Sequence, residues 1–174
     1  MGPSIEVIHL SSIPLSSLSI MISNYQPSSP VIHESKINHT SDILHPLARF
    51  VTEETVALMF GISEADIYRI DCMRHVVYVH GKGVSRFVSY ADFPPILGVA
   101  SPTLPDLARW HQRWRKGWRS LYAPQFWTQF YQVQLQKSQR LEQLQAWGLL
   151  IRSLKSGLSE TALVELRLAY KLKK

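Results

Sequence analysis

The short segment Gly61-Ile62-Ser63 constrains the possible folds of this chain more than any other feature. Before it, Thr52 can cap a helix over residues 53–60, whose first turn carries carboxylates that favour the positive end of the helix dipole. After it, Ser63 can cap a second helix, in which apolar side chains recur at helical spacing, namely Ile67, Ile70 and Met73. Two helices separated by so short an interval predict a helix-turn-helix.

The pattern changes from helical to extended after Arg74. Residues 76–79 are strand formers, Gly81-Lys82-Gly83 is a turn, and residues 84–88 are again extended, which predicts a β-hairpin, or wing. Ser89 can then cap a short turn that two prolines close. We therefore expect a winged helix-turn-helix domain over residues 47–95.

The flanking segments differ in character. Residues 1–46 are rich in Ser, Pro and Ile without a lasting period, which predicts a flexible or loosely docked N-terminal arm. Residues 96–174 are predicted to be helical, basic and aromatic-rich, with a long helix from Gln125 to Trp147 and a last helix capped by Ser159. The expected fold class is mainly α with a small β-hairpin wing: a winged helix-turn-helix domain followed by a helical dimerisation region.

Composition argues against an enzyme and against a metal or cofactor site. The chain has one cysteine, Cys72, which we interpret as structural, and its seven histidines stand at no ligand spacing. No phosphate-binding loop, nucleophile elbow or carboxylate cluster is present in the sequence. Neither a signal peptide nor a membrane span is convincing, so we expect a cytoplasmic, nucleoid-associated protein without a membrane partner.

Charge is distributed unevenly along the chain. The protein has a formal net charge of +6, and residues 101–174 carry thirteen Lys or Arg against four Asp or Glu, whereas the first hundred residues are net acidic. An anionic partner is therefore favoured. Aromatic and basic residues alternate in the same region, but tryptophans four apart, Trp110, Trp114 and Trp118, indicate a packed seam more often than a base-stacking surface.

The segment from Thr52 to Phe93 resembles the MerR and phage-excisionase superfamily of winged helix-turn-helix proteins. The matching features are Thr-Glu-Glu at 52–54, Val56-Ala57, Gly61-Ile62-Ser63, Ile67-Tyr68-Arg69, Arg86-Phe87 and Asp92-Phe93. In overall form the chain is also similar to the compact MerR-type repressors of type V-K CRISPR-associated transposons. The resemblance implies a dimeric repressor that dimerises through the long helix from Gln125 to Trp147 and binds specific sites on double-stranded DNA. No small-molecule effector is evident from the sequence.

The resemblance also implies which residues face DNA. The second helix would enter the major groove and present Tyr68 and Arg69 to the bases, while Arg74 would reach phosphate from the helix end. The wing would offer three further contacts, His80, Lys82 and Arg86. Separately from the resemblance, the basic charge of the C-terminal helices adds Arg113 and Arg115 as candidates for contacts beside the duplex.

One departure leaves alternatives open. Glu64, Asp66 and Asp71 make the predicted second helix acidic, and carboxylates near phosphates are usually unfavourable. An excisionase-like architectural factor would use the same domain to bend DNA. A protein-interaction module, whose aromatic helices dock on a larger assembly, is the third possibility.

Overall fold

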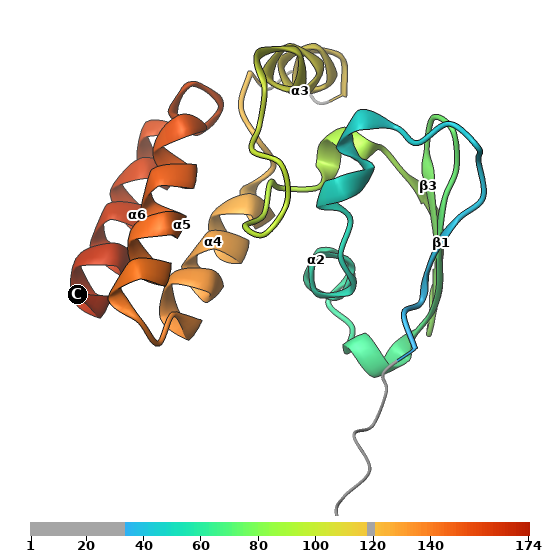
Figure 1. Ribbon diagram of the computed structural model, residues 1–174, viewed down its shortest axis with the longest axis horizontal. Coiled ribbons are helices and arrows are strands. Elements are labelled where there is room, and N and C mark those ends of the chain that lie inside the picture. Colours follow the sequence, from blue (N-terminus) through green and yellow to red (C-terminus); the bar gives the residue numbers. More distant parts are fainter. Residues whose placement is uncertain (1–33, 118–120) are drawn as a thin grey trace, which may run out of the picture. The chain divides into compact units, whose positions relative to one another are not determined.

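The computed structural model describes residues 34–117 and 121–174 (Figure 1). Within the described residues, five α-helices and four strands are connected by short 3-10 helices (η). In chain order these are β1 (Ile37–His39), η2 (Pro46–Phe50), α2 (Glu53–Phe60), η3 (Glu64–Asp66), β2 (Ile67–Cys72), β3 (Val77–Gly81), β4 (Val84–Val88), η4 (Tyr90–Asp92), α3 (Leu104–Gly117), α4 (Gln125–Lys137), α5 (Leu141–Ser153), η5 (Lys155–Gly157) and α6 (Glu160–Lys173). The fold is thus a mixture of helices and sheet.

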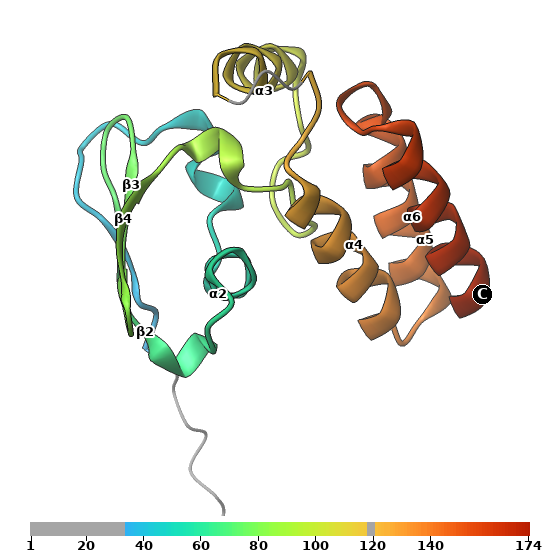
Figure 2. The same ribbon diagram turned by 180° about the vertical axis from the view of Figure 1, so that it is seen from behind.

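The four strands form a single sheet in the order β1-β2-β3-β4. Figure 2 shows this sheet nearly edge-on, with α2 on one side of it. β1 runs parallel to β2, whereas β2, β3 and β4 form an antiparallel meander. One face of the sheet packs toward α2 and buries apolar side chains, namely Ile67, Ile70, Cys72, Val77, Val79 and Val88. The alternation of side chains along each strand therefore sends the intervening residues to the opposite face.

The predicted second helix is wrong, because residues 67–72 form the strand β2. A β-bulge between Ile67 and Arg69 explains the misleading pattern. The extra residue turns Ile67 inward together with Ile70, so the strand imitates the spacing of three that a helix would give. Gly81 pairs with Ile67 at this bulge, and a Cβ on Gly81 would lie 2.8 Å from the carbonyl oxygen of Asp66, so only glycine allows this approach.

Other local predictions from residues 47–95 are confirmed. Thr52 Oγ1 accepts a hydrogen bond from the backbone N–H of Thr55, and Gly61 ends α2 in the left-handed conformation with φ of 63°. The hairpin forms as β3 and β4, and Ser89 caps η4. Within residues 53–88, α2 is therefore followed by the three strands β2, β3 and β4, whereas the sequence predicted two helices followed by a hairpin.

The N-terminal arm was expected over residues 1–46, and residues 1–33 lie outside the described part of the chain. Residues 37–39 nevertheless extend the sheet as β1, in register with residues 70–72 of β2. Lys36 helps to hold this strand, because its backbone N–H donates to a carboxylate oxygen of Glu53 at 2.9 Å. A parallel pair is formed between segments distant in sequence, so no local pattern could indicate it.

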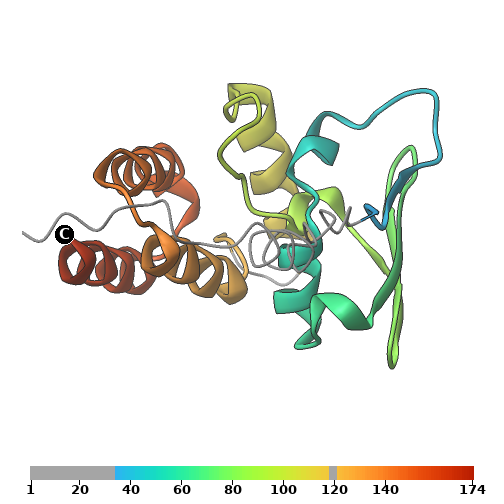
Figure 3. The ribbon, with the colours of Figure 1, turned by 60° about the horizontal axis from the view of Figure 1, so that its bottom comes forward.

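The C-terminal helices are separate elements, and the long helix predicted from Gln125 to Trp147 is wrong. The helix is interrupted after α4, where Ser138 adopts an extended conformation and its hydroxyl donates to the carbonyl of Gln134 at 2.9 Å. α4 contacts both α5 and α6 (Figure 3). The single long helix expected to support a dimer is therefore absent, and the homodimer stays a prediction.

Tryptophans join the sheet region to the helices, which confirms the packing interpretation for the described members of the stripe. The rings of Trp110 and Trp114 each meet Trp127 edge to face, with centroids 5.7 and 5.3 Å apart, and all three side chains are buried. Trp118 lies outside the described residues. The indole N–H of Trp127 donates to the carbonyl of Asp92 at 2.8 Å, which ties α4 to η4.

No described helix is long and apolar enough to span a bilayer.

His45 precedes η2 and caps its N-terminus. Its Nδ1 accepts a hydrogen bond from the N–H of Leu47 at 3.1 Å, and its ring stacks on Tyr90 with centroids 4.3 Å apart. Burial lowers the pKa of His45, and the positive charge of Arg109 lowers it further, although Asp106 opposes this. The folded state therefore favours the neutral imidazole, which is the form that can accept.

We expect the protein to lose stability as the pH falls through the ordinary histidine pKa of 6.5. A pKa lowered in the folded state means that the unfolded chain takes up the proton more readily, so the contribution of His45 is present above 6.5 and lost below it. His45→Asn keeps a side-chain acceptor that does not titrate. Urea midpoints at pH 7.5 and 5.5 should differ less for this variant than for the wild type; equal differences would contradict the assignment.

Candidate nucleic-acid interface

The face of the sheet directed away from α2 carries exposed aromatic side chains. We call it the open face; its rings and its cation are Tyr68, Arg69, Tyr78, His80 and Phe87, and the register places Asp71 and Ser85 on the same side. No described helix covers this face (Figures 1 and 2). Phe87 is 67% exposed and Tyr68 is 58% exposed, which is unusual for large rings in the middle of strands. Strand alternation and the bulge in β2 together place them on one side.

The register explains how these side chains meet. Residue Tyr78 of β3 pairs with Phe87 of β4, and His80 pairs with Arg69 of β2. The rings of Tyr78 and Phe87 have centroids 5.1 Å apart, and Tyr68 meets His80 edge to face at 5.3 Å. The face is thus a continuous row of rings across three strands, and the outermost rings keep one side open to solvent.

Arg69 provides a cation in the middle of the row. Its guanidinium carbon lies 5.9 Å from the ring centroid of Tyr78, and its Nε lies 2.8 Å from a carboxylate oxygen of Asp71. Asp71 is 12% exposed at its side chain, whereas Arg69 is 54% exposed. Asp71 pairs with Tyr78, so its carboxylate lies on the same face as Arg69 and holds the arginine in place, while the guanidinium keeps donors available to a ligand.

The other predicted contacts lie at different places. Arg74 and Lys82 are exposed in the two turns that flank β3, so they lie at opposite ends of the sheet. Arg86 is exposed but pairs in register with the buried Val79, which places it on the α2 side of the sheet. The structure therefore brings Tyr68, Arg69 and His80 together and leaves Arg86 apart from them.

The two predicted arginines of α3 are not part of the open face. Arg113 lies 3.7 Å from a carboxylate oxygen of Asp92, whose pKa is raised by burial despite this positive charge. Arg115 is exposed in the last turn of the same helix. A role for these arginines in DNA binding stays a prediction.

Sequence reasoning missed Tyr78 and Phe87, which are central to the open face. The signal was present, because strict alternation along residues 77–81 places Val77 and Val79 on one side and Tyr78 on the other. Once β3 and β4 were expected to form a hairpin, the same alternation would have marked Phe87 as outward-facing. The assumption that β2 was a helix removed the sheet face on which these rings meet.

Cys72 is buried on β2, and burial raises the pKa of its thiol, which agrees with a structural role. Among residues 34–117 and 121–174, no three His, Cys, Asp or Glu side chains are grouped closely enough to hold a metal ion. No family model, curated protein or solved structure matches the chain. The helix that carried the resemblance to the MerR superfamily is replaced by β2, so that resemblance stays a prediction.

Proposed function

We propose that this protein binds nucleic acid on the open face of its sheet and that unpaired bases stack on the exposed rings. The observation that carries the proposal is the high exposure of Phe87 and Tyr68, at 67% and 58%, on one face that also holds Arg69. Every base has a π face, so aromatic platforms of this kind accept single strands with little sequence preference.

The dimensions of the sheet favour a single strand over a duplex. Four strands spaced about 4.8 Å apart span about 14 Å, which exceeds the roughly 12 Å width of the major groove. Rings on such a face cannot reach the faces of bases that are paired and stacked within a helix. A splayed single strand, in contrast, can lay successive bases on Phe87, Tyr78 and Tyr68.

Cations around the sheet can hold the phosphates. Arg74 and Lys82 are exposed at either end of β3, and neither forms an ion pair with another described residue. A strand that crosses the face from one turn to the other would meet both of them, with Arg69 in between. Phosphate contacts would fix the position of the strand, and the rings would supply most of the binding energy.

The duplex-binding repressor predicted from the sequence is a competing proposal, because the basic residues of the C-terminal helices could still contact DNA. A protein-interaction role is a second candidate. It is favoured by the Arg69–Asp71 pair and by the exposed Tyr and Phe, which are residue types enriched in protein interfaces.

The proposal is tested by titrating the full chain against a labelled twelve-nucleotide single strand of mixed sequence and against the matched duplex. We expect at least tenfold tighter binding of the single strand. If Arg69, Arg74 and Lys82 each contact one phosphate, the logarithm of the association constant should fall with the logarithm of salt concentration with a slope of about −2.

Fluorescence anisotropy at several salt concentrations measures both quantities. Tighter binding of the duplex would favour the sequence-based prediction of a duplex reader. Failure of both nucleic acids to bind below micromolar concentration in low salt would contradict the proposal and leave the protein-interaction role.

A further inference from the structure

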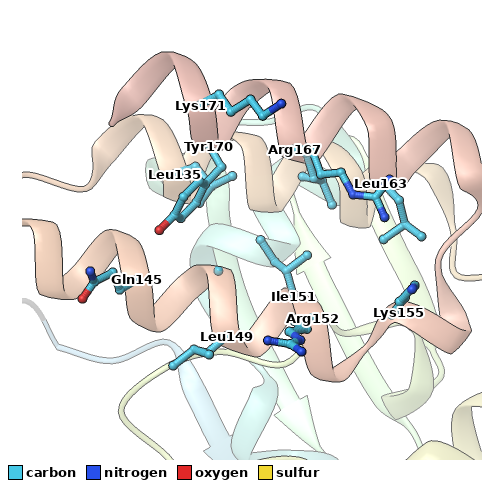
Figure 4. Close-up of a pocket in the computed structure, with 12 residues that line it drawn as sticks. Leu135, Gln145, Leu149, Ile151, Arg152, Lys155, Leu163, Arg167, Tyr170 and Lys171 are labelled. Carbon is cyan, nitrogen blue, oxygen red and sulfur yellow. The ribbon is translucent and has the colours of Figure 1, made fainter.

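An apolar groove with a basic rim lies between α5 and α6. Its volume is about 630 Å³, and Figure 4 shows side chains from both helices bordering it. α4 packs against α5 and against α6, whereas the backbones of α5 and α6 make few or no close contacts with each other. The two helices are therefore held apart at this point, and Leu135 of α4 lines the space between them.

The floor of the groove is apolar, and its rim is partly exposed. Ile151, Leu163 and Leu166 are buried, whereas Leu149 is 66% exposed on the edge contributed by α5. On the other side, the ring of Tyr170 extends from α6 to α5, where a Cβ on Gly148 would lie 2.9 Å from its Cε2. An exposed leucine beside a buried apolar floor indicates a surface that another apolar group can cover.

The charge of the rim is uniform. Arg152 and Lys155 border the groove from α5 and η5, and Arg167 and Lys171 border it from α6 (Figure 4). No Asp or Glu lines the groove. Among the described residues, only one of these four cations forms an ion pair: Arg167 lies 3.5 Å from Glu160, whose side chain is 78% exposed. The rim therefore favours an anionic ligand.

We propose that this groove binds an acidic amphipathic helix of a partner protein. The lining residues extend from 145 to 155 along one wall and from 163 to 171 along the other. At 1.5 Å per residue the α-helical part of the first wall, residues 145–153, is about 12 Å long, as is the second wall, which corresponds to slightly more than two turns of a bound helix. The apolar face of that helix would cover the floor, and its acidic flanks would meet the two basic edges.

The arrangement of the cations distinguishes this occupant from two others. A fatty acid or lysolipid carries its charge at one end, whereas the four cations are divided between both long walls of the groove. A second copy of this chain would bring its own basic face against the first, because residues 101–174 carry thirteen Lys or Arg against four Asp or Glu. Like charges brought into register are unfavourable at an interface.

The test is a selection of displayed twelve-residue peptides on the immobilised full chain, with counter-selection on the Leu149→Asp variant. We expect the enriched peptides to be net acidic, with apolar residues at i, i+3 or i+4, and i+7. Their synthetic, fluorescently labelled forms should bind at least tenfold more weakly to Leu149→Asp and to the double variant Arg152→Glu/Lys171→Glu.

Matched substitutions outside the groove are the controls. Leu168 is 57% exposed on α6 and does not line the groove, so Leu168→Asp should leave binding unchanged, as should Lys173→Glu/Lys174→Glu. Phe87→Ala on the open face should also have no effect, which separates this site from the proposed nucleic-acid interface.

Any of the following results would overturn the proposal: no enrichment above the counter-selection, enriched peptides without net negative charge, equal losses in the control variants, or tighter binding of dodecanoate or phosphatidylglycerol vesicles than of any selected peptide. Concentration-dependent dimerisation that Leu149→Asp abolishes would assign the groove to a second copy of the chain and likewise overturn it.

Discussion

Replacing both Tyr68 and Phe87 with alanine is expected to weaken binding of a twelve-nucleotide single strand by at least thirtyfold. Base stacking on an aromatic side chain contributes about 1–3 kcal/mol, so the loss of two rings removes about 2–6 kcal/mol. Both side chains are largely exposed, at 58% and 67%, so the substitutions should leave the fold intact. Anisotropy titrations measure the affinity, and thermal unfolding checks the stability.

Two controls distinguish stacking from a general loss of apolar surface. Tyr68→Phe and Phe87→Tyr keep a ring at each position and should retain most of the affinity. Leu104, which is 81% exposed at the start of α3, offers a matched apolar site outside the sheet, and Leu104→Ala should bind like the wild type. If the double alanine variant bound the single strand normally while the duplex affinity depended on Arg113 and Arg115, the open face would not be the interface.

The sequence predicted individual elements well where a short-range signal determines them. Thr52, Gly61, Ser89 and Ser159 each occupy the capping position that their side chain or backbone freedom favours. The hairpin turn after Gly81 was equally local. These signals act over three or four residues, so they do not depend on what the rest of the chain does.

Longer-range arrangements were not predictable from the same signals. The spacing of Ile67 and Ile70 fits a helix or a bulged strand equally well, and only pairing with β1 and β3 decides between them. Similarly, the spacing of Val133 and Leu141 fits one face of a single helix, although the chain is interrupted between α4 and α5. Leu141 is 52% exposed at the start of α5 and does not continue the buried face. The open face depends on the sheet, so an error in one strand concealed the site.

Arg49 connects the segment before α3 to η2, and one of its contacts is a buried carboxylate. Nη2 of Arg49 lies 2.6 Å from a carboxylate oxygen of Asp106, and the Asp106 side chain is only 2% exposed. Nε of Arg49 also donates to the carbonyl of Ala100 at 3.0 Å. Burial alone would raise the pKa of Asp106, but hydrogen bonds from Arg49 and Thr103 outweigh it and hold the pKa below its ordinary value of 3.8. The pair thus joins η2 to α3 and to the loop before it.

Arg49→Met is expected to lower the free energy of unfolding by about 3 kcal/mol at pH 7, because it leaves the Asp106 carboxylate buried without its main partner. Arg109, 3.2 Å from the other oxygen, can compensate only in part. Adding Asp106→Asn removes the buried charge and keeps an acceptor for the N–H of Thr103. The double variant Arg49→Met/Asp106→Asn should therefore be more stable than Arg49→Met alone. Urea unfolding measures both.

The pH dependence and a surface control complete this test. Because the pKa of Asp106 is lowered in the folded state, the stability that it provides is present above its ordinary value of 3.8 and lost as the pH falls below it. Arg167→Met removes the exposed pair with Glu160, whose side chains are 55% and 78% exposed, and should cost no more than about 1 kcal/mol. If Arg49→Met and Arg167→Met lowered the free energy of unfolding equally, the buried Arg49–Asp106 pair would be no more important for stability than an exposed pair.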